Sequence, residues 1–149
     1  MGSASKKHMK KIIFVLLLSF GFGCSMLSES FKNELDRKME LEVLVNKVNQ
    51  TLAWQTFDEL VPLIEGNPHE LMRMLTKEYK TTKINEVEVD QVTFEEESFR
   101  AYSVFKISAF SSPTYVLESH FDQIEWVYKA EEGGWKIKNL VIGRKSDKN

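Results

Sequence analysis

The spacing of apolar residues changes near residue 84 and divides the chain into a helical part and a strand part. Between residues 31 and 52, apolar side chains recur mostly at steps of three and four residues, which places them on one side of a long helix. The members of this stripe are Phe31, Leu35, Met39, Leu41, Leu44, Val48 and Leu52. The stripe drifts between Met39 and Leu41, so we expect a bend there.

Two short helices are predicted after the long one. Thr56 and Glu59 have the spacing of a capping box, and Pro62 limits the helix that they open. Residues 67–70 repeat the start signal, with an asparagine N-cap, a proline in the first turn and an acidic third residue. This third helix is expected to end near Lys80. Its expected buried residues are Leu71, Leu75 and Tyr79.

Four strands are predicted from residue 84 onward, because β-branched and aromatic residues are concentrated in four stretches. The stretches are INEVEVDQVTF (84–94), FRAYSVFKISAF (99–110), YVLESHFDQIEWVYKA (115–130) and WKIKNLVIGR (135–144). The connecting stretches EEES, SSPT and EEGG are read as turns, and Pro113 lacks the backbone donor that a central strand needs. Short turns between consecutive strands predict an antiparallel meander.

Three helices followed by four strands, over roughly residues 31–144, resemble the nuclear transport factor two-like fold, also called the cystatin-like or SnoaL-like cone. The resemblance lies in LAWQTFDELVPLI and in IEWVYKAEEGGWKIKNLVI, where an aromatic strand, a glycine turn and a Trp-x-Ile strand are typical of the family. It implies an α+β domain with N-terminal helices packed in a curved, cone-shaped, four-stranded antiparallel sheet. The family includes isomerases, dehydratases, transport adaptors and assembly proteins, so the resemblance implies no single activity.

The start of the chain has the order of regions of a secretory signal peptide. Four lysines precede an apolar run at residues 12–22. This run is shorter than the about 20 residues that cross a membrane. Residues 1–23 are therefore expected to be a cloning leader, with Met9 as the natural start, and a signal peptide.

Cys24 is the only cysteine and follows Gly23 directly. This resembles the lipobox of bacterial lipoproteins, in which the chain is cut before a cysteine that then carries acyl chains. Gly21 and Phe22 depart from the usual motif, and Gly21 with Gly23 also fits an ordinary signal peptidase. Lipid attachment at Cys24 is expected, with a secreted or periplasmic form as the alternative. A lone cysteine forms no internal disulfide, so the core must hold by packing.

The charge balance excludes a typical nucleic-acid binder. The chain has 20 Lys and Arg against 22 Asp and Glu, and without the four leader lysines 16 basic residues remain. The mature domain is therefore acidic, and it lacks the runs of Lys and Arg on which duplex binding depends.

The third strand carries the best candidate for chemistry. Glu118, His120 and Asp122 alternate onto one face, and a carboxylate beside an imidazole can support acid–base catalysis with Tyr102 opposite. Enzymes of the resembled fold use Asp, His or Tyr in this way. The alternative is that this half of the strand simply faces water. His69 and His120 lie on different elements without zinc spacing, so no metal and no cofactor are expected.

The aromatic residues have two interpretations. Tyr102, His120, Trp126 and Tyr128 are candidates for ligand binding, since rings near the last hairpin could stack on a ligand. Alternatively, Trp126, Tyr128 and Trp135 cover the end of the core.

The strand at 99–110 is apolar on both faces, and three helices can cover only one face of the sheet. We therefore expect a homodimer through the sheet, as the resemblance implies.

These patterns predict a polar tether at residues 24–30, one cone-shaped domain at 31–144 and a tail at 145–149. The expected function is an exported, lipid-anchored, non-catalytic binding or assembly module of the bacterial cell envelope, outside the membrane, with a small apolar ligand or an envelope protein as partner. The alternative is a small enzyme of the isomerase or dehydratase kind that uses His120, Asp122 and Tyr102.

Overall fold

The computed structural model describes residues 23–144 and divides the chain into two compact units, Met1–Asp36 and Arg37–Asn149. The predicted signal peptide before residue 23 and the tail at 145–149 lie outside the described residues. Within residues 23–144, no helix is both long and apolar enough to cross a membrane.

Helix α2 (Gly23–Trp54) runs through residues 39–41 without a break, and a bend there stays a prediction. It also includes residues 24–30, which the sequence predicts as a tether. Its buried apolar side chains are Leu41, Val45, Val48 and Leu52, and Thr51 is buried with them. Leu35 and Met39 are 51% and 50% exposed. At 3.6 residues per turn, Met39 lies about 200° around the helix from Leu41, which turns it off the buried stripe.

The two short helices begin differently from one another. The side chain of Thr56 forms no cap of η1 (Phe57–Leu63), so the predicted capping box is wrong. Its backbone oxygen instead accepts from the amide of Glu59 over 3.0 Å, the tight turn of a 3-10 helix. The start of α3 (Pro68–Tyr79) is as predicted, because the side chain of Asn67 accepts from the amide of His69 over 3.1 Å.

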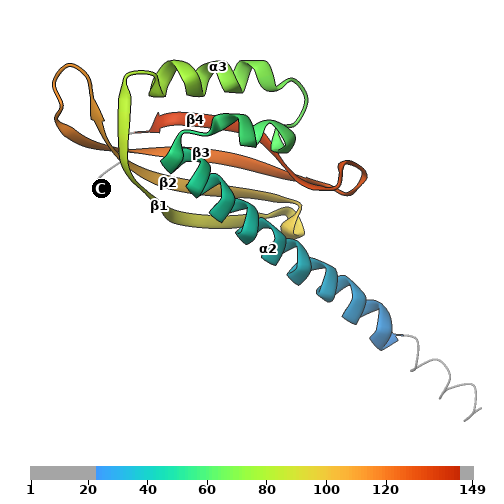
Figure 1. The fold of residues 1–149 in the computed structure, drawn as a ribbon. Helices are drawn as coiled ribbons and strands as arrows, with labels where there is room; N and C mark the ends of the chain where they lie inside the picture. The colour runs from blue at the N-terminus through green and yellow to red at the C-terminus, as the bar shows by residue number, and fades with distance from the viewer. Residues whose placement is uncertain (1–22, 145–149) are drawn as a thin grey trace, which may run out of the picture. The chain divides into compact units, whose positions relative to one another are not determined.

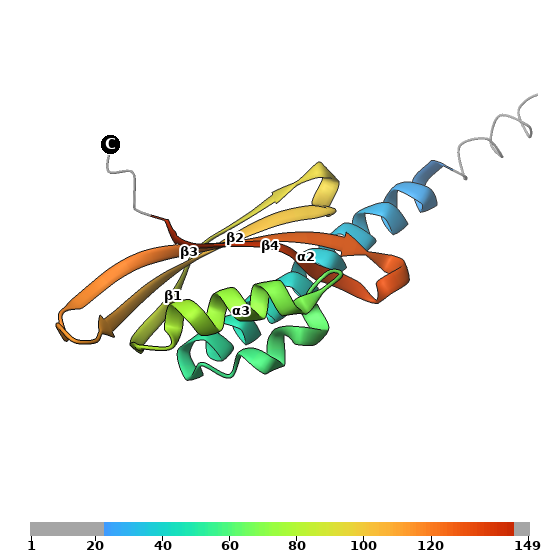
Figure 2. The ribbon, with the colours of Figure 1, turned by 90° about the horizontal axis from the view of Figure 1, so that it is seen from above.

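The four strands form one antiparallel sheet in the order β1-β2-β3-β4, which confirms the predicted meander and the α+β class. The strands are β1 (Thr82–Glu95), β2 (Arg100–Ser111), β3 (Leu117–Lys129) and β4 (Gly134–Arg144), with one-turn helices η2 (Glu96–Ser98) and η3 (Ala130–Glu132) at two of the turns. In the second unit, the rest of α2, η1 and α3 all lie on one face of this twisted sheet (Figures 1 and 2). Register shifts in β1, β3 and β4 add local bends.

The alternation along β2 shows which face of the sheet the helices cover. Every second residue is buried beneath them, and these are Ala101, Ser103, Phe105, Ile107 and Ala109. The residues between them lie on the uncovered face and are half-buried. Ion pairs also lie there: Lys106 with Glu88 at 3.3 Å, and Lys138 with Glu125 at 3.1 Å. The predicted contact of this face with a second copy stays a prediction.

The β3–β4 turn needs glycine because of its backbone conformation. Gly134 is buried, with φ +116°, a backbone conformation that other residues rarely adopt. A Cβ at this position would overlap the carboxylate of Glu40 in α2. The EEGG stretch therefore turns the chain through a glycine with positive φ.

Candidate functional site

Three polar side chains meet where the end of α3 lies against β3. Tyr79 is the last residue of α3, while His120 and Asp122 point to the same face of β3. The Tyr79 hydroxyl donates to Asp122 Oδ2 over 2.5 Å and lies 3.0 Å from His120 Nε2. His120 Nε2 is also 3.4 Å from Asp122 Oδ1. We call these three residues the Tyr79 cluster.

Asp122 is the centre of the Tyr79 cluster and is completely buried. Its second oxygen, Oδ1, accepts from the backbone amide of Gly143 in β4 over 3.0 Å. A buried carboxylate needs such donors, because taking it out of water costs several kcal/mol unless hydrogen bonds replace the lost hydration. The cluster thus fastens α3, β3 and β4 to one another.

Both titratable partners of Asp122 hold their protons more strongly than usual. Burial, followed by the charge of Asp122, raises the pKa of Tyr79 far above its ordinary range. The hydrogen bond to Asp122 raises the pKa of His120, although burial of the ring opposes this. Tyr79 is 3% exposed, so little of this residue is open to water.

His120 is expected to make stability depend on pH in one direction. Its folded pKa lies above the unfolded value of about 6.5, so its contribution is complete below that pH and is lost as pH rises through the folded pKa. Between about pH 6 and pH 8, denaturant unfolding should therefore show a larger loss of stability in the wild type than in His120→Gln. Identical pH profiles for the two proteins would show that His120 does not titrate with folding.

Tyr102 does not join His120 and Asp122, so the predicted acid–base trio is not assembled. Its neighbours Ala101 and Ser103 are buried under the helices, and residues of opposite parity on a strand point to opposite faces. Tyr102 is paired with Glu125 on the uncovered face. Tyr79, from a helix, supplies the tyrosine that meets the pair.

The aromatic residues near the last hairpin close one end of the core. Trp126 and Trp135 are 0% and 2% exposed, and Trp135 Nε1 donates to the backbone oxygen of Arg37 over 2.8 Å. Tyr128 packs edge-on against Trp135 and against Phe99. The Arg37 guanidinium lies 4.2 Å from the centroid of the Phe99 ring. No single place gathers the predicted ligand-binding residues Tyr102, His120, Trp126 and Tyr128.

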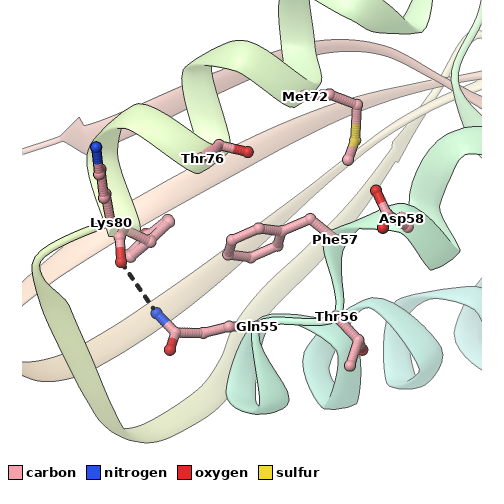
Figure 3. Close-up of a pocket in the computed structure, with 8 residues that line it drawn as sticks. Gln55, Thr56, Phe57, Asp58, Met72, Thr76 and Lys80 are labelled. Atoms are coloured by element: carbon pink, nitrogen blue, oxygen red, sulfur yellow. Dashed lines mark hydrogen bonds between the residues drawn. The ribbon is translucent and has the colours of Figure 1, made fainter.

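A hollow of about 320 Å³ lies between η1 and α3 (Figure 3). An adjoining hollow of about 490 Å³ extends along α3. Together they form what we call the η1–α3 groove. The ring of Phe57 points between the two elements, and Met72 and Thr76 reach toward it from α3 (Figure 3). Its polar lining includes Asp58 on one side and Lys80 on the other.

The η1–α3 groove suits binding better than chemistry. Phe57 and Met72 offer an apolar floor, and a flexible methionine adapts to different shapes. Arg73, Lys77 and Lys80 add positive charge along the α3 side. Tyr79 is among the residues that line the groove, whereas His120 and Asp122 are not.

The groove and the role of Tyr79 were missed in the sequence. Tyr79 was recognised as buried, and a buried tyrosine needs a hydrogen-bond partner, so its hydroxyl was the available signal. Phe57 and Met72 become neighbours only through the packing of η1 on α3.

The described residues 23–144 contain no group of three His, Cys, Asp or Glu that could hold a metal ion.

Neither protein-family models nor curated proteins match the chain. Among solved structures, a SEC-C motif containing protein from Rhodopseudomonas palustris is similar at 16% identity and a TM-score of 0.47, over 62% of this chain and 70% of that one. The intermembrane space region of the chloroplast protein ARC6 is similar at 15% identity and a TM-score of 0.43, over 72% of this chain and 96% of that one. Both TM-scores are below 0.5, so these likenesses add nothing to the functional interpretation.

Proposed function

We propose that this protein is an exported, lipid-anchored and non-catalytic binding module of the bacterial cell envelope. The observation that carries the non-catalytic part is the closed Tyr79 cluster. An acid or base catalyst must come within hydrogen-bond reach of a substrate atom. Tyr79 and Asp122 are buried and bonded to each other, and the side chain of His120 is only 27% exposed.

The binding site that we propose is the η1–α3 groove. Its apolar floor favours a ligand with an apolar body, and the cations along α3 favour negative charge at one end of that ligand. An open groove does not exclude water, which suits recognition of a ligand or of a segment of an envelope protein.

The anchored location is supported by the sequence. A basic region, an apolar run and Gly23-Cys24 follow the order of a processed lipoprotein leader. The resemblance to the nuclear transport factor two-like family is part of the same proposal, supported by the order of three helices and a four-strand meander.

The anchor is tested by the intact mass of the chain after production in a bacterium that processes lipoproteins. We expect the chain to be recovered in the membrane fraction, to begin at residue 24 and to carry acyl chains on Cys24. The Cys24→Ala variant should lack this added mass. An uncut chain without acyl chains, in the wild type, would refute the anchored location.

The groove is tested by native mass spectrometry of the chain released from those membranes. We expect a bound species on the wild type that is lost in Thr76→Trp, because the indole would fill the groove. The matched control is Thr93→Trp, which alters an exposed threonine of β1. A bound species that both variants retain would place recognition elsewhere.

A further inference from the structure

We infer that one end of the domain contacts the lipid bilayer directly, through exposed aromatic and aliphatic side chains flanked by lysines. This inference rests on the proposed membrane location and adds a second contact to the acyl anchor. The end consists of the C-terminal ends of α2 and α3 and of the β2–β3 turn. We call it the turn edge and define it by Trp54, residues 80–83 and residues 111–117.

Hydrogen bonds hold the parts of the turn edge together. Gln55, the residue after Trp54, donates through Nε2 to the backbone oxygens of Tyr79 and Thr82 over 3.2 and 3.0 Å. The amide of Ser112 donates to the backbone oxygen of Thr81 over 3.1 Å. Figures 1 and 2 both show the C-terminal ends of α2 and α3 toward the end of the sheet that carries the β2–β3 turn.

The turn edge exposes apolar groups that a water-facing turn normally avoids. Tyr115, Val116 and Leu117 are consecutive and are 71%, 55% and 50% exposed, and Trp54 is 79% exposed. Runs of three exposed apolar residues are unusual in soluble domains unless they serve a contact. The chemistry of these residues therefore indicates a partner that accepts both aromatic rings and aliphatic chains.

A bilayer fits this chemistry. Trp and Tyr favour the boundary between headgroups and acyl chains, and lysines keep their ammonium groups at the headgroups. Lys80 and Lys83 of the turn edge are exposed. Lipid phosphates attract such lysines. Exposed Glu78 and Glu118 reduce the net positive charge near the turn edge. The apolar side chains should therefore contribute most to membrane binding.

The test uses the tryptophan fluorescence of the full chain, purified from bacterial membranes and returned to phosphatidylcholine vesicles, with and without phosphatidylglycerol. The chain has three tryptophans, of which Trp126 and Trp135 are 0% and 2% exposed. Acyl chains that carry bromine quench only a tryptophan that reaches them, so they report on Trp54. We expect most of the Trp54 emission to be quenched and its access to acrylamide to fall several-fold. Trp54→Phe should abolish both effects.

A variant of the turn separates the edge from the anchor. Tyr115→Ser with Leu117→Ser should lose most of the quenching, while Val43→Ser, at a residue of α2 that is 69% exposed and outside the turn edge, should keep it. If the wild-type chain is recovered with the vesicles but its Trp54 emission is not quenched, the inference is overturned and the lipid anchor is still supported. Quenching in Cys24→Ser would support the edge without the anchor.

Two further outcomes are decisive. A wild-type chain that does not associate with the vesicles would overturn both the edge and the anchor. Concentration-dependent shielding of Trp54 without lipid, unchanged by vesicles, would assign the turn edge to a second copy instead.

Discussion

Replacement of Asp122 by alanine is expected to lower the free energy of unfolding by about 3 kcal/mol. The carboxylate is completely buried and accepts from the Tyr79 hydroxyl and the Gly143 amide. Its removal would take the acceptor from the Gly143 amide and leave the Tyr79 hydroxyl with His120 Nε2 alone. Denaturant unfolding should show a lower midpoint with an unchanged slope, because the surface exposed on unfolding stays nearly the same.

The matched control for this substitution is Asp90→Ala, an exposed aspartate of β1. Surface substitutions away from special contacts usually change stability by less than about 0.5 kcal/mol. Equal effects at the two positions would mean that Asp122 is hydrated in solution and that the Tyr79 cluster does not hold the layers together.

Trp126→Ala is expected to cost about 4 kcal/mol, which is a large part of the stability of a domain of this size. The side chain is fully buried in the core, and its Nε1 donates to Ser103 Oγ over 2.8 Å. Truncation would leave a large cavity between the sheet and the helices and would remove the partner of a buried hydroxyl. The measurement is again the denaturant midpoint, read by circular dichroism.

Trp54→Ala is the control for Trp126→Ala, since it removes the same side chain from a position that is 79% exposed. Its effect on unfolding should be close to zero. If Trp54→Ala destabilised the domain as much as Trp126→Ala, the assignment of Trp126 to the core would be wrong.

Much of the fold could be predicted because local signals and packing agree. The change from helical to alternating spacing near residue 84 located the four strands, and Asn67 with Pro68 marked the start of α3. The signal at Thr56 failed because Thr56 has φ −89° and ψ 54° rather than an extended cap conformation. Such a backbone choice depends on how the chain turns from α2 into η1.

The candidate site could be predicted only in part. Alternation placed His120 and Asp122 on one face of β3, and the structure agrees. The same alternation also places Tyr102 opposite to the buried Ala101 and Ser103, but the face that the helices cover was unknown. Tyr79 reaches Asp122 because α3 crosses the sheet at that point. Sequence spacing carries no information on that crossing.

The Tyr79 cluster is expected to be a structural network rather than an open acid–base site. A double-mutant cycle with Tyr79→Phe, Asp122→Ala and the combined variant measures this directly as the coupling between hydroxyl and carboxylate. We predict a coupling of about 1 to 3 kcal/mol in the free energy of unfolding, as for residues in one buried hydrogen-bond network. Additive effects of the two substitutions would contradict the account.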